Sequence, residues 1–65
     1  MKIRKWEDFK EFIGKEMYDL WKVMPESFER TVMESGRQVF THTDTGKKLE
    51  VIHDEWGIIK EINRL

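Results

Sequence analysis

The chain has no cysteine, a single proline, four glycines and no long apolar run. The absence of cysteine excludes disulfides and thiolate metal sites, and it suits a reducing, cytoplasmic compartment. No segment approaches the run of about 18 apolar residues that a membrane helix needs, and the charged first residues do not resemble a signal peptide. We therefore expect a soluble cytoplasmic protein without membrane association, stabilised by packing or by a partner.

An excess of charge of one sign is also missing. Twelve Lys and Arg face thirteen Asp and Glu, which gives a net charge of -1. Dedicated nucleic-acid binders usually carry a basic stripe, because their affinity grows with the number of phosphates that they neutralise. The overall charge argues against that class, although a local basic patch remains compatible with it.

Apolar residues are present in two different rhythms. They recur every three or four positions over residues 1–36 and alternate over residues 37–65, with Gly36 where the spacing changes. The first spacing is typical of amphipathic helices and the second of strands. We predict one α+β domain over residues 1–65, in which a long N-terminal helix and a short second helix pack on a three-stranded antiparallel meander. At this length only about 60% of the unfolded surface is buried, so the core is marginal.

The long helix is expected to run from Trp6 to Met24. Acidic residues in its first turn complement the helix dipole, and Pro25 ends it. Gly14 would lie inside this helix, either facing solvent or allowing a close neighbour. The apolar arc covers roughly half of the circumference, which is wider than the ~100° stripe that one core requires.

Residues 25–36 are expected to form the short second helix. Proline suits a first helical turn, and Gly36 suits the position just past a helix end. Phe28 and Val32 would be its buried anchors, and the alternative is a loop that contains one helical turn.

Three β-branched and aromatic runs follow, at 39–43, 49–52 and 58–62, separated by turn sequences at 44–47 and 54–57. A two-residue loop at Thr45 and Gly46 would pair Phe40 with Val51 and put both on one face. Residues 58–65 also fit helical spacing, but their β-branched character favours a strand.

Candidate catalytic groups are few. His42 and His53 are the only imidazoles, and the expected pairing separates them by roughly 13 Å along neighbouring strands, too far to share a metal. No glycine-rich phosphate loop or nucleophile elbow is present. We expect no enzymatic activity, no metal and no cofactor.

One stretch resembles a known family. Residues 38–51, QVFTHTDTGKKLEV, superficially resemble the HicA-type toxins, RNA-cleaving proteins with a double-stranded-RNA-binding fold. This resemblance implies a helix before and after the hairpin and an RNA-cleaving activity. The family carries a glycine-serine-histidine motif on its first strand. That triplet is absent here, so the resemblance assigns no catalytic residue.

Large apolar side chains outnumber the places that one helix on three strands offers for burying them. Three Trp, four Phe and four Met occur in 65 residues, and Trp and Met are typical anchors of protein interfaces. We therefore expect a non-enzymatic interaction module, a regulator or inhibitor that occupies a partner surface, and a homodimer through the helix or an edge strand. The size suits a product of a phage or mobile element. The expected interface residues are Phe12, Glu16, Trp21, Val23 and Trp56.

The alternative function is that of a small nucleic-acid-binding dimer. If the N-terminal arm lies beside the tip of the first hairpin, basic residues from both would form a cationic edge. The expected contacts are Lys2, Arg4, Lys5, Arg37, Lys47 and Lys48.

Overall fold

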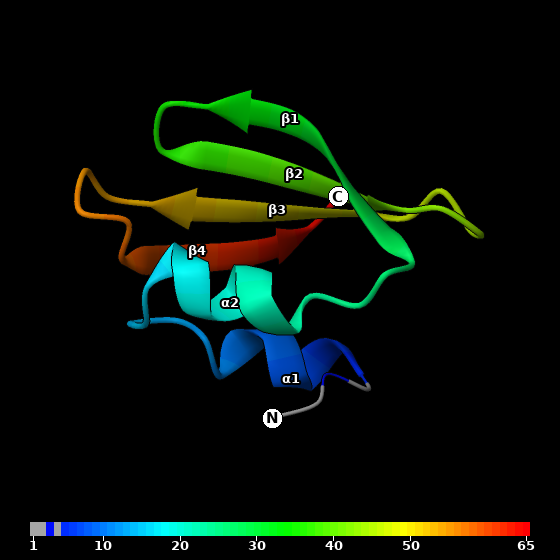
Figure 1. Cartoon of the computed structure of the whole chain (residues 1–65), viewed down its shortest axis with the longest axis horizontal. Coiled ribbons are helices and arrows are strands. Elements are labelled where there is room, and N and C mark those ends of the chain that lie inside the picture. Colours follow the sequence, from blue (N-terminus) through cyan, green and yellow to red (C-terminus); the bar gives the residue numbers. More distant parts are fainter. Residues whose placement is uncertain (1–2, 4) are drawn as a thin grey trace.

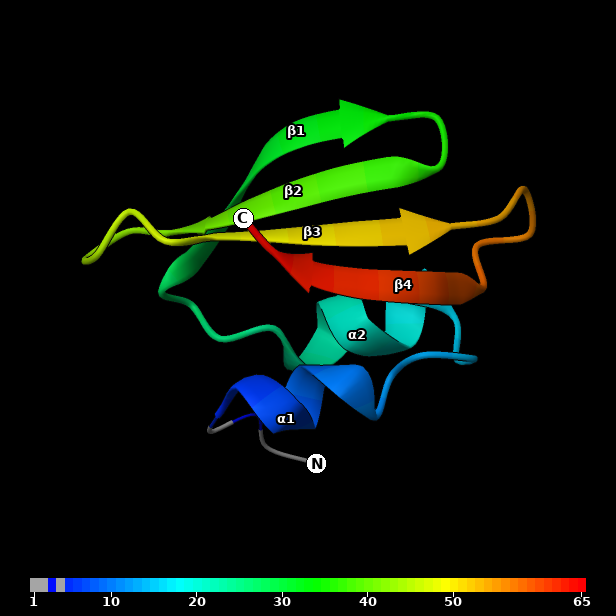
Figure 2. The ribbon, with the colours of Figure 1, turned by 180° about the vertical axis from the view of Figure 1, so that it is seen from behind.

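The computed structural model describes residue 3 and residues 5–65, and this part of the chain forms two short helices followed by a four-stranded sheet. The sheet is an antiparallel meander in the order β1-β2-β3-β4 (Figure 1). The view from behind shows both helices near β4, with β1 at the far edge (Figure 2). The elements are α1 (Trp6–Lys10), α2 (Met17–Val23), β1 (Phe28–Glu34), β2 (Arg37–His42), β3 (Lys48–His53) and β4 (Ile59–Arg64).

The core lies between the helices and one face of the sheet. Phe40, Leu20, Ile59 and Val51 are its largest fully buried side chains. We call the opposite side of the sheet the open face, since no helix packs on it. None of the helices in the described residues is long and apolar enough to cross a membrane. The remaining core members are Ile3, Phe9, Phe12, Met17, Leu49 and Ile62.

The expectation of one long N-terminal helix was wrong, because the helix breaks between Lys10 and Met17. Gly14 adopts a φ of +91°, a left-handed conformation that cannot continue a right-handed helix. In place of further helical turns, the segment around Gly14 and Lys15 forms hydrogen bonds with the start of β4. The N–H of Gly14 donates to the carbonyl of Ile59 (2.8 Å), and the N–H of Ile59 donates to the carbonyl of Lys15 (2.8 Å). These bonds satisfy backbone groups that the interrupted helix leaves unpaired.

Replacing Gly14 with alanine distinguishes the broken helix from a continuous one by the sign of the effect. An added Cβ would meet no atom within 4 Å, so the change acts only through the positive φ. We expect a loss of roughly 1–2 kcal/mol in the free energy of unfolding, measured by urea denaturation. In a continuous helix the same change would add about 1 kcal/mol, so a more stable variant would contradict the break.

The expected helix over residues 25–36 is also absent, since Phe28–Glu34 is strand β1. The meander therefore has four strands, and the expectation of three was wrong. The β1–β2 register shifts between Arg30 and Val32, where a β-bulge inserts one residue. The bulge puts Phe28 and Val32 on opposite faces, because Phe28 pairs with His42 and Val32 with Val39.

The other three strands occur where the sequence predicts them, but their register differs. Phe40 pairs with Leu49 rather than Val51, since the loop before β3 is longer than two residues: the N–H of His42 donates to the carbonyl of Lys47 (2.8 Å). The slip is two positions, so the expected sharing of one face by Phe40, Leu49 and Val51 is retained. Residues Ile59–Arg64 form a strand and not a helix, as the sequence favours.

The turn before β4 is held by Asp54. Its carboxylate accepts hydrogen bonds from the N–H groups of Trp56 and Ile58, both at 2.9 Å. The hydrogen bond from Ile58, followed by the one from Trp56 and the charge of Lys60, holds the pKa of Asp54 below its ordinary value. This turn carries the Trp56 side chain outward, where it is 76% exposed.

Candidate functional site

A groove opens beside the start of α1, at the end of the sheet where β1 begins and where β2 and β4 end. Its volume is about 670 Å³, within the range of about 300–1,000 Å³ that is usual for ligand pockets. We call it the cationic groove. Trp6 and Phe9 come to it from α1, Phe28 from β1 and His42 from β2, so segments far apart in sequence form its walls.

The aromatic rings of the groove form a continuous row. Trp6 lies 6.0 Å from Phe9, Phe9 lies 5.5 Å from Phe28, and Phe28 lies 5.0 Å from the His42 imidazole, all between ring centroids. The last two contacts are edge-to-face, a favourable geometry for aromatic pairs. Phe9 is buried, whereas the other three rings are partly exposed. The row therefore offers ring surface to a ligand and is supported from below by the core.

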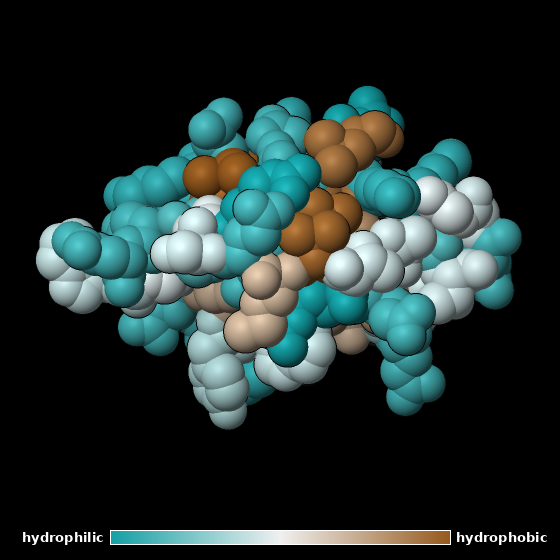
Figure 3. All heavy atoms as spheres, turned by 90° about the horizontal axis from the view of Figure 1, so that it is seen from above, coloured by the Kyte–Doolittle hydropathy of each residue, from teal (hydrophilic) through white to brown (hydrophobic). Residues whose placement is uncertain are grey.

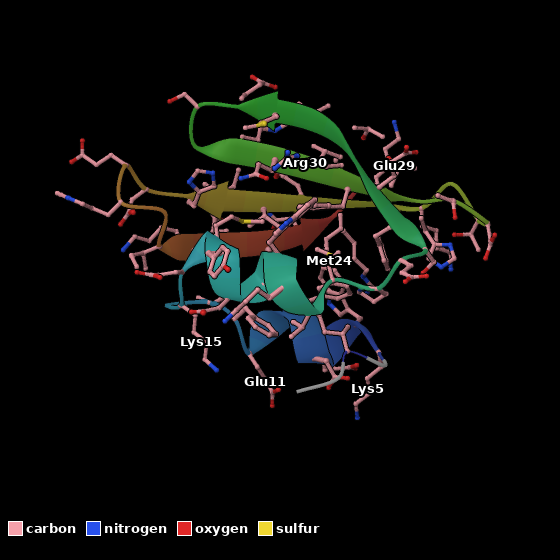
Figure 4. All side chains as sticks on the ribbon, in the orientation of Figure 1. Lys5, Glu11, Lys15, Met24, Glu29 and Arg30 are labelled. Atoms are coloured by element: carbon pink, nitrogen blue, oxygen red, sulfur yellow. The ribbon has the colours of Figure 1, made fainter. Side chains whose placement is uncertain are left out.

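Cationic side chains line the same groove from three directions. Lys5 precedes α1 at the rim of the groove and points into solvent (Figure 4), Lys47 ends the β2–β3 loop, and Arg64 ends β4. Lys48 begins β3 and alternates with the buried Leu49, so its side chain lies on the open face. The Arg64 guanidinium lies 5.0 Å from the centroid of the Trp6 ring. No aspartate or glutamate side chain is among the described residues that line the groove. Because the whole chain has a net charge of -1, the groove is a local positive region on an otherwise acidic molecule.

The structure brings only part of the expected basic set together. Lys5 and Lys47 share the groove, whereas the side chains of Arg37 and Lys48 lie on the open face, and Lys2 and Arg4 lie outside the described residues. Arg64 is a groove residue that the sequence reasoning missed. Its position depends on the pairing of β3 with β4, which sets Arg64 opposite Leu49.

Arg37 is held by carboxylates. Its Nε donates to Glu50 (2.6 Å) and its Nη1 donates to Glu34 (2.9 Å). The hydrogen bond to Glu50, followed by the one to Glu34, raises the pKa of Arg37. The hydrogen bonds that Glu50 accepts from Arg37 and Asn63 hold the pKa of Glu50 below its ordinary value. The guanidinium of Arg37 therefore has acidic neighbours that would compete with a phosphate.

The expected protein-interface residues are scattered. Phe12 is 4% exposed in the core, and Val23 packs against the core. Glu16 is exposed at the start of α2 and forms an isolated bridge with Ile58. Trp21 is 48% exposed on α2, and Trp56 lies in the β3–β4 turn. Only Trp21 of this set adjoins a second exposed apolar group.

A smaller hollow of about 270 Å³ lies between α2 and β1. Its lining residues are Met17, Tyr18, Trp21, Arg30 and Gln38. Arg30 projects from β1 toward α2 (Figure 4), and its guanidinium lies 4.8 Å from the centroid of the Trp21 ring. Met33 lies on the same sheet face and is 70% exposed. The space-filling view onto the β1 edge shows apolar side chains emerging among hydrophilic ones (Figure 3). We call the surface that carries Tyr18, Trp21, Arg30 and Met33 the α2–β1 patch.

The histidines lie in different environments. The Nδ1 of His42 accepts a hydrogen bond from the N–H of Thr45 (3.3 Å), while His53 contacts the buried Gln38 amide (3.3 Å). Among the described residues no group of three or more His, Cys, Asp or Glu side chains is placed to hold a metal ion.

No protein family matches the chain, and no curated protein or solved structure is significantly similar to it. The final strand β4 also differs from the helix that the resemblance to the HicA-type toxins implies.

Proposed function

We propose that this chain is a non-enzymatic binding module that holds an anionic partner in the cationic groove. The observation that supports this proposal is the composition of the groove: three cations and a row of rings, with no acidic side chain among its described lining residues. Positive charge concentrated over an apolar floor attracts anions and excludes water from the contact. Such a module acts by occupying its partner, as a regulator or inhibitor does.

The test uses fluorescence anisotropy with two labelled polyanions, a single-stranded oligothymidylate of about 15 nucleotides and an oligoglutamate peptide of similar charge. At least one probe should bind at about 50 mM salt, and its affinity should fall steeply by about 200 mM. Failure of both probes to bind at the lower salt concentration would overturn the proposal.

We also propose self-association through the α2–β1 patch. Tyr18 and Trp21 on α2 and Met33 on β1 are exposed, and β1 is a sheet edge whose outer side pairs with no other described strand. Exposed edges and clustered Trp, Tyr and Met are common at subunit interfaces. A second copy seated here would give a twofold dimer, the commonest closed assembly.

Sedimentation equilibrium is the measurement for this dimer. The chain should approach twice its 8.0 kDa mass as concentration rises. Tyr18→Glu places a charge in the patch and should shift the equilibrium toward monomer, whereas Trp56→Glu, in the β3–β4 turn and outside the patch, should not. A chain that stays monomeric at high concentration would refute self-association.

A further inference from the structure

The shape of the cationic groove distinguishes among anionic partners. Its rings come from α1, β1 and β2 and follow one another at centroid separations of 6.0, 5.5 and 5.0 Å. Successive rings beside a positive groove are the arrangement on which the bases of a single nucleic-acid strand stack. A ligand that carried charge alone would leave these partly exposed rings unused.

The cations are placed beside the rings rather than among them. Lys47 lies at the His42 end of the row, where its carbonyl accepts a hydrogen bond from the N–H of His42 (2.8 Å), and Arg64 lies at the Trp6 end. A strand lying along the row would therefore meet a cation at each end for its phosphates, with the rings between them for its bases. Arg64 is planar and already faces the Trp6 ring, so it can stack on a base as well as pair with a phosphate.

Other anions fit these features less well. An acidic peptide would engage the cations, but its aliphatic carboxylate side chains have no flat face for Trp6 and Phe28. A nucleic-acid duplex keeps its base faces stacked inside and presents phosphates, sugars and base edges, so it offers no flat base face to the rings. Resting on the proposed function, we propose that the cationic groove binds a short segment of single-stranded nucleic acid, with bases stacked on Trp6, Phe28 and His42.

Trp6 can report directly on stacking. The chain has three tryptophans, so the variant Trp21→Phe with Trp56→Phe leaves Trp6 as the only indole. Both changes keep an aromatic ring, and circular dichroism checks that the fold is retained. Oligothymidylate should quench Trp6 fluorescence in step with binding, whereas oligoglutamate should not quench it.

Affinity gives a second measurement. Trp6→Leu should weaken oligothymidylate binding by about 5- to 150-fold, the equivalent of the about 1–3 kcal/mol of one base–aromatic stack, while Trp56→Leu should leave it unchanged. A thermal melt verifies that Trp6→Leu remains folded. The quenching experiment uses the variant that keeps Trp6, so it stays valid even if Trp6→Leu unfolds.

The results separate this inference from the proposed function. Binding of oligoglutamate or of a duplex as tightly as oligothymidylate, without Trp6 quenching, would overturn the single-strand inference and leave an anion-binding module. Absence of binding by every probe would overturn both. Tight oligothymidylate binding with quenching supports both.

Discussion

Reversing the charge of Lys47 and Arg64 together, by Lys47→Glu and Arg64→Glu, should reduce oligothymidylate affinity by about 60-fold or more at about 50 mM salt. Lys47 lines the cationic groove where β2 connects to β3, and Arg64 lines it at the end of β4. Release of counterions makes each phosphate contact of a single strand worth about eightfold at this salt, so two lost contacts account for about 60-fold. The new carboxylates repel the phosphates, which adds to the loss.

The salt dependence should change with the affinity. Three groove cations give a slope of log K against log salt of about -2.1, and removing two leaves a slope of about -0.7. Both quantities follow from anisotropy titrations over a salt series. A flat salt dependence of the unmodified chain would mean that the three cations do not contact the strand.

The matched control is Lys15→Glu with Lys22→Glu, which changes the net charge by the same amount. Both lysines are exposed and neither lines the groove, and Lys15 projects at the far side of the molecule from Lys5 (Figure 4). At distances beyond about 10 Å, salt near 0.1 M screens their charge. Equal losses for the two pairs would show that overall charge, rather than the groove, sets the affinity.

Replacing Phe40 with alanine should remove most of the stability of the domain. Phe40 is fully buried at the centre of the core, on the strand between β1 and β3. Phe→Ala changes in cores cost about 3–5 kcal/mol. A domain of this length has roughly 3–10 kcal/mol in total, so urea or thermal denaturation should show a much earlier transition or an unfolded chain.

Met33→Ala provides the comparison for this change. Met33 lies on the same face of the sheet but is 70% exposed, so its truncation should stay within about 0.5 kcal/mol of the unmodified chain. Similar losses for the two variants would contradict the placement of Phe40 in the core.

The strands of the C-terminal half could be predicted because their signals are local. β-branched and aromatic runs between turns with early aspartate and late glycine mark β2, β3 and β4. The faces survived an error in register, because a slip of two positions preserves the alternation of side chains. The length of the loop before β3 was the missing information, and it depends on hydrogen bonds that composition does not specify.

The N-terminal half was predicted wrongly for physical reasons that concern two glycines and a bulge. Gly14 was expected within a helix, yet its left-handed backbone and its bonds to β4 end that helix, a tertiary effect. Gly36 has a φ of +80° in the β1–β2 turn, a conformation equally suited to a helix end. A spacing of four residues, as between Phe28 and Val32, fits one face of a helix and one face of a regular strand alike, so it did not identify β1. The bulge near Thr31 then places these two side chains on opposite faces of the sheet.

Part of the candidate site was visible in the sequence and part was not. Lys5, Lys47 and Lys48 were expected to meet if the N-terminal arm approached the hairpin. Lys5 and Lys47 lie at one groove, whereas alternation along β3 puts the Lys48 side chain on the open face. Arg64 and the row of rings depend on contacts between residues distant in sequence. In the sequence Arg37 is indistinguishable from the other basic residues, and only the fold pairs it with Glu34 and Glu50.

The pairing of residues 14–17 with β4 makes the two margins of the sheet unequal. The outward N–H of Ile59 donates to Lys15, and its carbonyl accepts from Gly14, so a further strand cannot pair with β4 at this residue. The outer edge of β1 stays accessible among the described strands. Copies that joined through β1 would each present the obstructed margin to the outside. If the proposed dimer forms in this way, growth would end at a pair, because the obstructed margin does not accept a further strand at Ile59.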